Sequence, residues 1–274
     1  METVYHYCPV ESFFSILSTK IIWLSNVNSM NDFHENIWAD KFVIAELRKL
    51  IEVAGQESVN AAWEIYQRSK PNPFIFCLSG EPDILSQWRG YASDGTGIAI
   101  GINANSLTKN RHHPMHNITK SMSLTLNQVV YNEKQQEKII IDFFNSDLIN
   151  SIKSRTLHPN NLQLCVQQLT GYAATFKNPA FSQEKEWRLI HTPMLMGREG
   201  GGHATEVIGS DYKLEQRVVN GEIRSYFEFP LPSDFLKEIW LGPKCRVNDL
   251  DLTLLLSNTG HTNTPILRSA ASYR

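Results

Sequence analysis

The sequence predicts a mixed α+β protein. Its 274 residues are 42% hydrophobic and 20% charged, which is the balance of an ordinary globular chain. Short β-rich segments and segments of helical periodicity follow one another without a strict strand–helix–strand rhythm, and this favours α+β over a doubly wound sheet. We see no internal repeat or low-complexity linker. We therefore expect a single domain over residues 1–274, with a helical insert at about 35–70.

The strand predictions rest on short runs of β-branched and aromatic residues between turn residues. Val4–Tyr7 is the first such run, and Asn220-Gly221 is a strong hairpin turn signal between two later runs. Further strands are expected at Ile21–Ser25, Phe74–Leu78, Gly97–Ile102, Ser123–Tyr131, Glu184–His191, Tyr212–Val219, Glu222–Phe229, Lys237–Leu241 and Ile266–Arg268.

Helices are predicted where apolar residues recur at helical spacing. Val10–Ser18 is the first, and the insert is a long helical stretch over Glu35–Ser69 that breaks at Gly55 and ends before Pro71. The other expected helices are Ser86–Tyr91, Asn132–Lys153, Asn160–Lys177 and Asn248–Leu256.

Charge and cysteine usage exclude several broad classes. The net charge is -2, so no global charge attracts nucleic acid or an anionic membrane. The four cysteines lie far apart and form no CxxC pair, so we expect reduced and mostly buried thiols. No apolar run approaches the ~18–20 residues that span a bilayer, and the N-terminus lacks a signal-peptide pattern. We expect a cytoplasmic protein that does not enter a membrane.

The first candidate site is the segment Tyr5-His6-Tyr7. On a strand the two tyrosines face one side and His6 the other. Taken alone, His6 fits a packed histidine with a hydrogen bond in the core better than a functional one. Trp23-Leu24-Ser25 follows, and a serine at a strand end, such as Ser25, can hydrogen-bond a ligand.

A second pair of candidates follows the strand at Phe74–Leu78. Ser79 ends that strand, and Trp88 and Tyr91 are three residues apart on one face of the next helix. Aromatic residues at this spacing usually belong to a core. The alternative is a platform on which a flat ring stacks.

Glu184, Glu186 and Arg188 form the least ordinary pattern in the chain. On a strand these three side chains share one face, while Trp187 and Leu189 point to the core. Two carboxylates and a guanidinium are costly to bury unpaired. The simplest interpretation is a solvated face with a surface ion pair, and the alternative is the floor of a cleft.

A metal site is a further alternative. Asp32, His34 and Glu35 are potential ligands, but metal sites usually need spaced ligands with a contribution from elsewhere in the chain. Asn31 or Asp32 at the start of a helix fits a capping role better.

In order and wording, these segments resemble a bacterial family known only as a domain of unknown function. The likeness covers most of the chain, from Val4 to at least Gly242. Its motifs are Tyr5-His6-Tyr7, Ser15-Ile16-Leu17, Trp23-Leu24-Ser25, Asn31-Asp32, Cys77-Leu78-Ser79, Trp88-Arg89-Gly90-Tyr91, Gly97-Ile98-Ala99-Ile100-Gly101 and Glu184-Lys185-Glu186-Trp187-Arg188.

More remotely, the N-terminal part resembles the ADP-ribosyltransferase superfamily. In that superfamily a histidine on the first strand and a glutamate on a later strand complete the site, here His6 and Glu186. Glu184-x-Glu186 also resembles the Glu-x-Glu pair of arginine- or guanine-directed transferases, a pair that normally accompanies an arginine on the first strand. This likeness implies largely antiparallel sheets around a central cleft.

The resemblance implies an NAD-dependent transferase that cleaves the nicotinamide–ribose bond and modifies a nucleic acid or protein, as a toxin or phage-defence effector. Glu186, His6 and Glu184 would be catalytic. NAD would contact His6, Tyr7, Trp23, Ser25, Ser79, Trp88, Tyr91 and Arg188.

Two functions of other classes stay open. One is a nonenzymatic sensor or binding module of a defence system, with a partner protein encoded in the same operon. The other is a metal-dependent nuclease that uses Asp32, His34 and Glu35.

Overall fold

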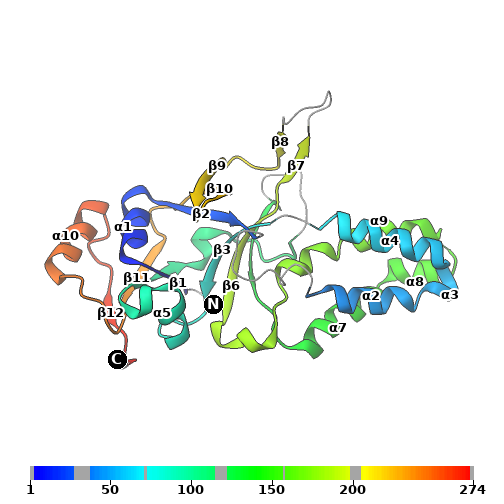
Figure 1. Ribbon diagram of the computed structural model, residues 1–274, viewed down its shortest axis with the longest axis horizontal. Coiled ribbons are helices and arrows are strands. Elements are labelled where there is room, and N and C mark those ends of the chain that lie inside the picture. Colours follow the sequence, from blue (N-terminus) through cyan, green and yellow to red (C-terminus); the bar gives the residue numbers. More distant parts are fainter. Residues whose placement is uncertain are drawn as a thin grey trace.

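A computed structural model gives the architecture of the chain, with mixed strands and helices as predicted (Figure 1). The structure describes residues 3–27, 38–70, 73–114, 122–156, 158–197 and 205–271. Ten strands form one sheet, and two short strands, β7 (Met194–Gly197) and β8 (Thr205–Ile208), pair separately. The large sheet contains β1 (Thr3–Cys8), β2 (Ile21–Asn26), β3 (Phe74–Ser79), β4 (Ile98–Asn103), β5 (Leu124–Gln128), β6 (Glu186–His191), β9 (Lys213–Val219), β10 (Glu222–Pro230), β11 (Leu236–Leu241) and β12 (Ile266–Arg268).

The sheet forks at β3. On one edge, β3 pairs with β6 along its whole length, and β6 pairs with β5. On the other edge, the start of β3 pairs with β2, while its last residue, Ser79, pairs with Tyr5 of β1. The two branches then continue as β1-β4-β11-β12 and as β2-β10-β9. All these pairings are antiparallel except β11 with β12, so the sheet is mixed and mostly antiparallel.

One face of the sheet is apolar, and we call it the core face. Val4, Leu24, Phe76 and Ile100 lie on it in the main hydrophobic cluster. Helices α1 (Val10–Thr19) and α10 (Asp249–Thr259) add buried residues to this cluster. We call the opposite face the polar face, because charged, hydroxyl and aromatic side chains alternate with the core residues along the same strands.

A group of helices lies at one end of the molecule (Figure 1). They share a second hydrophobic cluster, which includes Leu47, Tyr66, Ile140 and Phe176. The Lys41 ammonium and Glu133 carboxylate also connect two of them, at 2.8 Å. The members are α2 (Asp40–Arg48), α3 (Ile51–Ala54), α4 (Gln56–Arg68), α7 (Glu133–Phe144), α8 (Asp147–Lys153) and α9 (Leu162–Gln167).

The predicted elements are largely confirmed, with several differences. The helix expected over 132–153 is divided into α7 and α8, and the helix expected over 160–177 ends at Gln167 and continues as 3-10 turns. The strand expected from Ser123 ends at Gln128, and β6 begins at Glu186 rather than Glu184. The hairpin at Asn220-Gly221 is confirmed, whereas β7, β8 and the short helix α6 (Ala104–Leu107) were not predicted.

The expectation that the cysteines are mostly buried is met only in part. None of the four cysteines forms a disulfide; Cys8 and Cys165 are buried, whereas Cys77 and Cys245 are partly exposed. None of the helices within the described ranges has both the length and the apolar character needed to cross a membrane.

Candidate functional site

A buried charge cluster lies at the start of β6. Both oxygens of the Glu186 carboxylate meet the Arg188 guanidinium: Oε1 lies 2.8 Å from Nε and Oε2 lies 3.0 Å from Nη2. The Lys177 ammonium lies 3.0 Å from the same Oε2 and 2.7 Å from Glu184 Oε2. Arg188 Nη1 also donates to the Ala174 carbonyl at 3.0 Å. Lys177 thus bridges the two carboxylates of the Glu-x-Glu pair.

The cluster fixes the ionisation of Glu186. Only 5% of this residue is exposed, and burial alone would raise the pKa of its carboxyl group. The attraction of Arg188 and Lys177 outweighs burial and lowers the pKa of Glu186 to about 2. The predicted solvated face with a surface ion pair is therefore wrong, because Arg188 is 1% exposed. The charges can be buried since each has an opposite partner.

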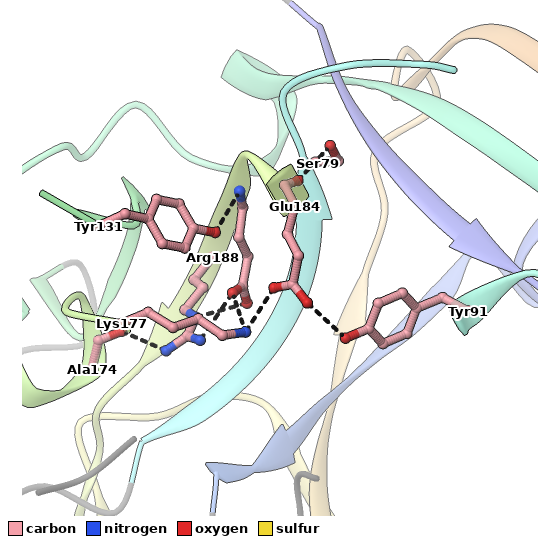
Figure 2. Close-up of polar contacts among 8 residues, drawn as sticks. Ser79, Tyr91, Tyr131, Ala174, Lys177, Glu184 and Arg188 are labelled. Carbon is pink, nitrogen blue, oxygen red and sulfur yellow. Dashed lines mark hydrogen bonds and ion pairs between the residues drawn. The ribbon is translucent and has the colours of Figure 1, made fainter. Parts of the chain in front are cut away.

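Glu184 lies in a 3-10 turn before β6 rather than on the strand. Lys185, between the two glutamates, has a φ of 47°, and this left-handed residue lets both carboxylates reach Lys177 despite the change of backbone direction. The Ser79 hydroxyl donates to the Glu184 carbonyl at 2.9 Å. Figure 2 shows the Lys177 ammonium and the Tyr91 hydroxyl approaching the Glu184 carboxylate from opposite sides. The Tyr91 bond is long, at 3.3 Å.

Two members of this cluster were not predicted from the sequence. Lys177 lies beyond the end of α9, in a segment that was expected to be helical. Tyr131 accepts a hydrogen bond from the Glu186 backbone N–H at 3.1 Å (Figure 2). No local pattern marks either residue, because both meet the cluster only through tertiary contacts. Buried Glu186 and Arg188 need further partners, but the sequence did not indicate that they are buried.

The register places His6 and Glu186 on opposite faces of the sheet. Tyr5 pairs with Ser79, and Ser79 pairs with Glu186, so these three side chains lie on the polar face. His6 is next to Tyr5 and therefore points to the core face. The expectation that His6 and Glu186 line one cleft is wrong, because the sheet lies between their side chains.

His6 instead packs on the core face, where β1 and β3 separate. Its ring lies 4.1 Å from the Phe76 ring, measured between centroids, and Nδ1 donates to the Cys77 carbonyl at 3.0 Å. Tyr5 and Ser79 pair between β1 and β3, and the two strands separate beyond them. Burial lowers the pKa of His6 to about 4, and the ring is neutral at neutral pH. The packed histidine was the correct alternative.

Tyr7 and Trp88 lie on the polar side of the sheet but are buried. Trp88 is 0% exposed and its indole N–H donates to Asp83 at 2.6 Å, while the Tyr7 hydroxyl donates to the Glu81 carbonyl at 2.9 Å. Their rings contact each other edge to face. Neither ring is available to stack on a ligand, so the predicted contact of NAD with these two aromatics is wrong. Tyr91, at 45% exposed, is available.

Trp23 and Ser25 lie on the polar face of β2. Ser25 pairs with Ile75 of β3, so it shares a face with Ser79 and Glu186. Trp23 is 41% exposed, and the Arg217 guanidinium lies 4.8 Å from its ring and donates to the Ser25 hydroxyl at 3.3 Å. This branch of the sheet therefore presents an exposed indole beside a cation.

The proposed metal ligands Asp32, His34 and Glu35 lie outside the described residues. Within the described ranges, no three His, Cys, Asp or Glu side chains are grouped as a metal site requires.

The comparisons with known proteins concern the middle of the chain. A family model described as "Protein of unknown function (DUF2971)" matches residues 87–189. This segment contains Tyr91, Lys177, Glu184, Glu186 and Arg188, but not His6 or Trp23. Neither the curated proteins nor the solved structures contain a significant match. Residues 87–189 thus match a protein family of unknown function, as the motifs predicted, and the likeness to ADP-ribosyltransferases stays a prediction.

Proposed function

We propose that the chain is an ADP-ribosyltransferase-like protein that uses NAD on the polar face of its sheet, with Glu184 beside the reacting ribose. The observation that supports this assignment is the difference between the two carboxylates. The Glu184 side chain is 16% exposed, against 6% for Glu186, and a long bond from Tyr91 is its contact on the side away from Lys177. Glu184 can exchange that bond for a ribose hydroxyl, whereas Glu186 has no oxygen without a cationic partner.

The chemistry gives each member of the cluster a role. Cleavage of the nicotinamide–ribose bond develops positive charge on the ribose, as in glycoside hydrolysis. A carboxylate that is already oriented stabilises this charge, and electrostatic groups of this kind contribute about 3–4 kcal/mol. Lys177 orients Glu184, and Glu186 holds Lys177 in place through its 3.0 Å contact. Glu186 is then a positioning residue, while exposed Tyr91 offers a ring for nicotinamide.

The decisive experiment compares Glu184→Gln with the wild type for NAD turnover, measured as nicotinamide release. We expect a loss of about a hundred- to a thousandfold, the magnitude typical of one electrostatic group. Glu64→Gln, which removes a carboxylate that is 65% exposed, is the matched control and should turn over NAD normally. Labelled NAD with added DNA, RNA or protein would identify the acceptor. Full turnover in Glu184→Gln would contradict the proposal.

A nonenzymatic sensor or binding module is the second candidate. Two observations favour it. All four carboxylate oxygens of Glu184 and Glu186 already have partners within the protein. His6 faces the core rather than the charge cluster. Such a protein would bind NAD, or a partner protein from the same operon, without releasing nicotinamide. Calorimetry that detects NAD binding, together with no nicotinamide release by the wild type, would support this candidate over the transferase.

A further inference from the structure

A second candidate binding site lies at the first turn of α1. A cavity of about 590 Å³ is lined there by Val10, Thr96, Lys244, Arg246 and Val247. This volume lies within the range of small-molecule sites. The lining includes no residue of the charge cluster, so this candidate site does not depend on the proposed function.

The charges around this cavity are predominantly positive. The Lys244 ammonium lies 2.8 Å from Asp94 Oδ2, and Arg89 lies 4.0 Å from the other oxygen of the same carboxylate. Arg246 pairs with no carboxylate among the described residues. Asp94, which is 63% exposed and does not line the cavity, thus has two cationic partners, and Arg246 adds a further positive charge to the lining. An anion is the complementary ligand.

The start of α1 adds to this positive potential. Its N-cap residue is Pro9, whose side chain accepts no hydrogen bond from the first turn. The N–H groups of a first turn lack partners within the helix, and the helix dipole makes this end positive. The one acid in the first turn, Glu11, is exposed and is not among the lining residues. Val10 brings this end of the helix to the cavity.

Close backbone packing holds the lining residues in place. The Gly242 N–H donates to the Gly97 carbonyl at 3.0 Å, and the Lys244 N–H donates to the Gly95 carbonyl at 2.9 Å. A methyl group at Gly242 would lie 2.4 Å from the Gly95 oxygen, so this approach requires glycine. The two loops that carry Thr96 and Lys244 are therefore fixed to each other before any ligand binds. A binding site gains affinity from such preorganisation.

We propose that this cavity binds a phosphate group, either inorganic phosphate or the phosphate of a small phosphomonoester. Arg246 and Lys244 would contact the phosphate oxygens, since a guanidinium and an ammonium both suit this anion. The first-turn N–H groups of α1 would donate to it as well. Val10 and Val247 offer an apolar surface to the remainder of a larger ligand.

The test is an NMR titration of the isotope-labelled full chain with inorganic phosphate, against sodium chloride at the same ionic strength. We expect saturable shifts of the Glu11, Ser12 and Thr96 amide signals. Arg246→Gln and Lys244→Gln should each weaken the apparent affinity about tenfold, as expected for the loss of one charge-assisted hydrogen bond. The control Arg224→Gln, on β10 and outside the lining of the cavity, should bind phosphate as the wild type does.

A parallel titration with adenosine monophosphate distinguishes the two sources of phosphate. Binding tighter than that of inorganic phosphate assigns a phosphomonoester, and equal binding assigns the free ion. Shifts that do not saturate, or equal affinities in the wild type and Arg246→Gln, would overturn the site. Because the signals report each amide separately, a variant that fails to fold is recognised from its spectrum, and the other variant then decides.

Discussion

Replacing Glu186 with glutamine tests whether the buried charge cluster stabilises the fold as the geometry predicts. The substitution keeps the shape of the side chain but removes its charge. Arg188, which is 1% exposed, then stays buried but loses the opposite charge of Glu186. Removing one partner of a buried ion pair typically costs about 3–5 kcal/mol.

The pKa of Glu186 gives an independent magnitude. It lies at about 2 in the folded protein, against an ordinary value of 4.5 that applies to the unfolded chain. At about 1.4 kcal/mol for each pKa unit, this difference corresponds to about 3 kcal/mol of stability at neutral pH. The two routes agree, so we expect Glu186→Gln to lower the free energy of unfolding by about 3 kcal/mol.

The sign of the pH dependence follows from the lowered pKa. A carboxyl group whose pKa is depressed on folding stabilises the protein above its unfolded pKa, and this contribution disappears as the pH falls toward the folded pKa. The window runs from 4.5 down to about 2. About 1 kcal/mol of the contribution should be lost by about pH 4, and about 2 kcal/mol by about pH 3.

Urea unfolding, followed by far-ultraviolet circular dichroism at neutral pH and near pH 4, measures both quantities. The difference between wild type and Glu186→Gln should narrow on acidification. Glu64→Gln, whose partner Arg68 is 78% exposed, serves as the control and should change stability by less than about 0.5 kcal/mol at either pH. A difference for Glu186→Gln below about 1 kcal/mol, or one that does not narrow with acid, would refute the role of the cluster.

Four further substitutions test other features. His6→Leu removes the hydrogen bond to the Cys77 carbonyl and should cost about 1–3 kcal/mol in urea unfolding without changing NAD turnover. Lost turnover in a folded variant would return His6 to the site. Gly97→Ala places a methyl 2.2 Å from a backbone oxygen and should lower the melting temperature. Gly90→Ala, in open space on α5 (Leu85–Tyr91), should raise it by adding about 1 kcal/mol of helix propensity. Equal melting temperatures of the two variants would contradict this contrast. Trp88→Phe removes the indole bond to a carboxylate and should cost about 1–3 kcal/mol in urea unfolding, so unchanged stability would argue against the buried position of the ring.

Most strands and helices could be predicted because their signals are local. The helical spacing of Phe13 and Leu17 and the turn residues Asn220-Gly221 each act over a few neighbouring residues. The helix expected up to Lys177 was wrong beyond Gln167, where 3-10 turns replace it. There Lys177 leaves the helical path and meets Glu186 in the buried cluster.

The candidate site was predicted less completely than the fold. The sequence indicated Glu184, Glu186 and Arg188 as a unit, and the structure brings their side chains together. The sequence did not indicate that these side chains are buried, because the burial of a strand face depends on which other segments cover it. The prediction that His6 and Glu186 share one site was wrong for a related reason. The alternation of side chains along one strand is a local property, but whether residues of two strands share a face depends on the register between the strands.

By itself, the sequence determined the α+β class, the order of the elements and the alternation of core and polar residues on each strand. Those features follow from side-chain chemistry over a few residues. Only the tertiary structure decided which polar residues meet. The pairing of Tyr5 with Ser79 and of Ser79 with Glu186 sets the faces of the sheet, and it places His6 in the core and Lys177 between two carboxylates. Register and long-range packing join residues that no local pattern connects.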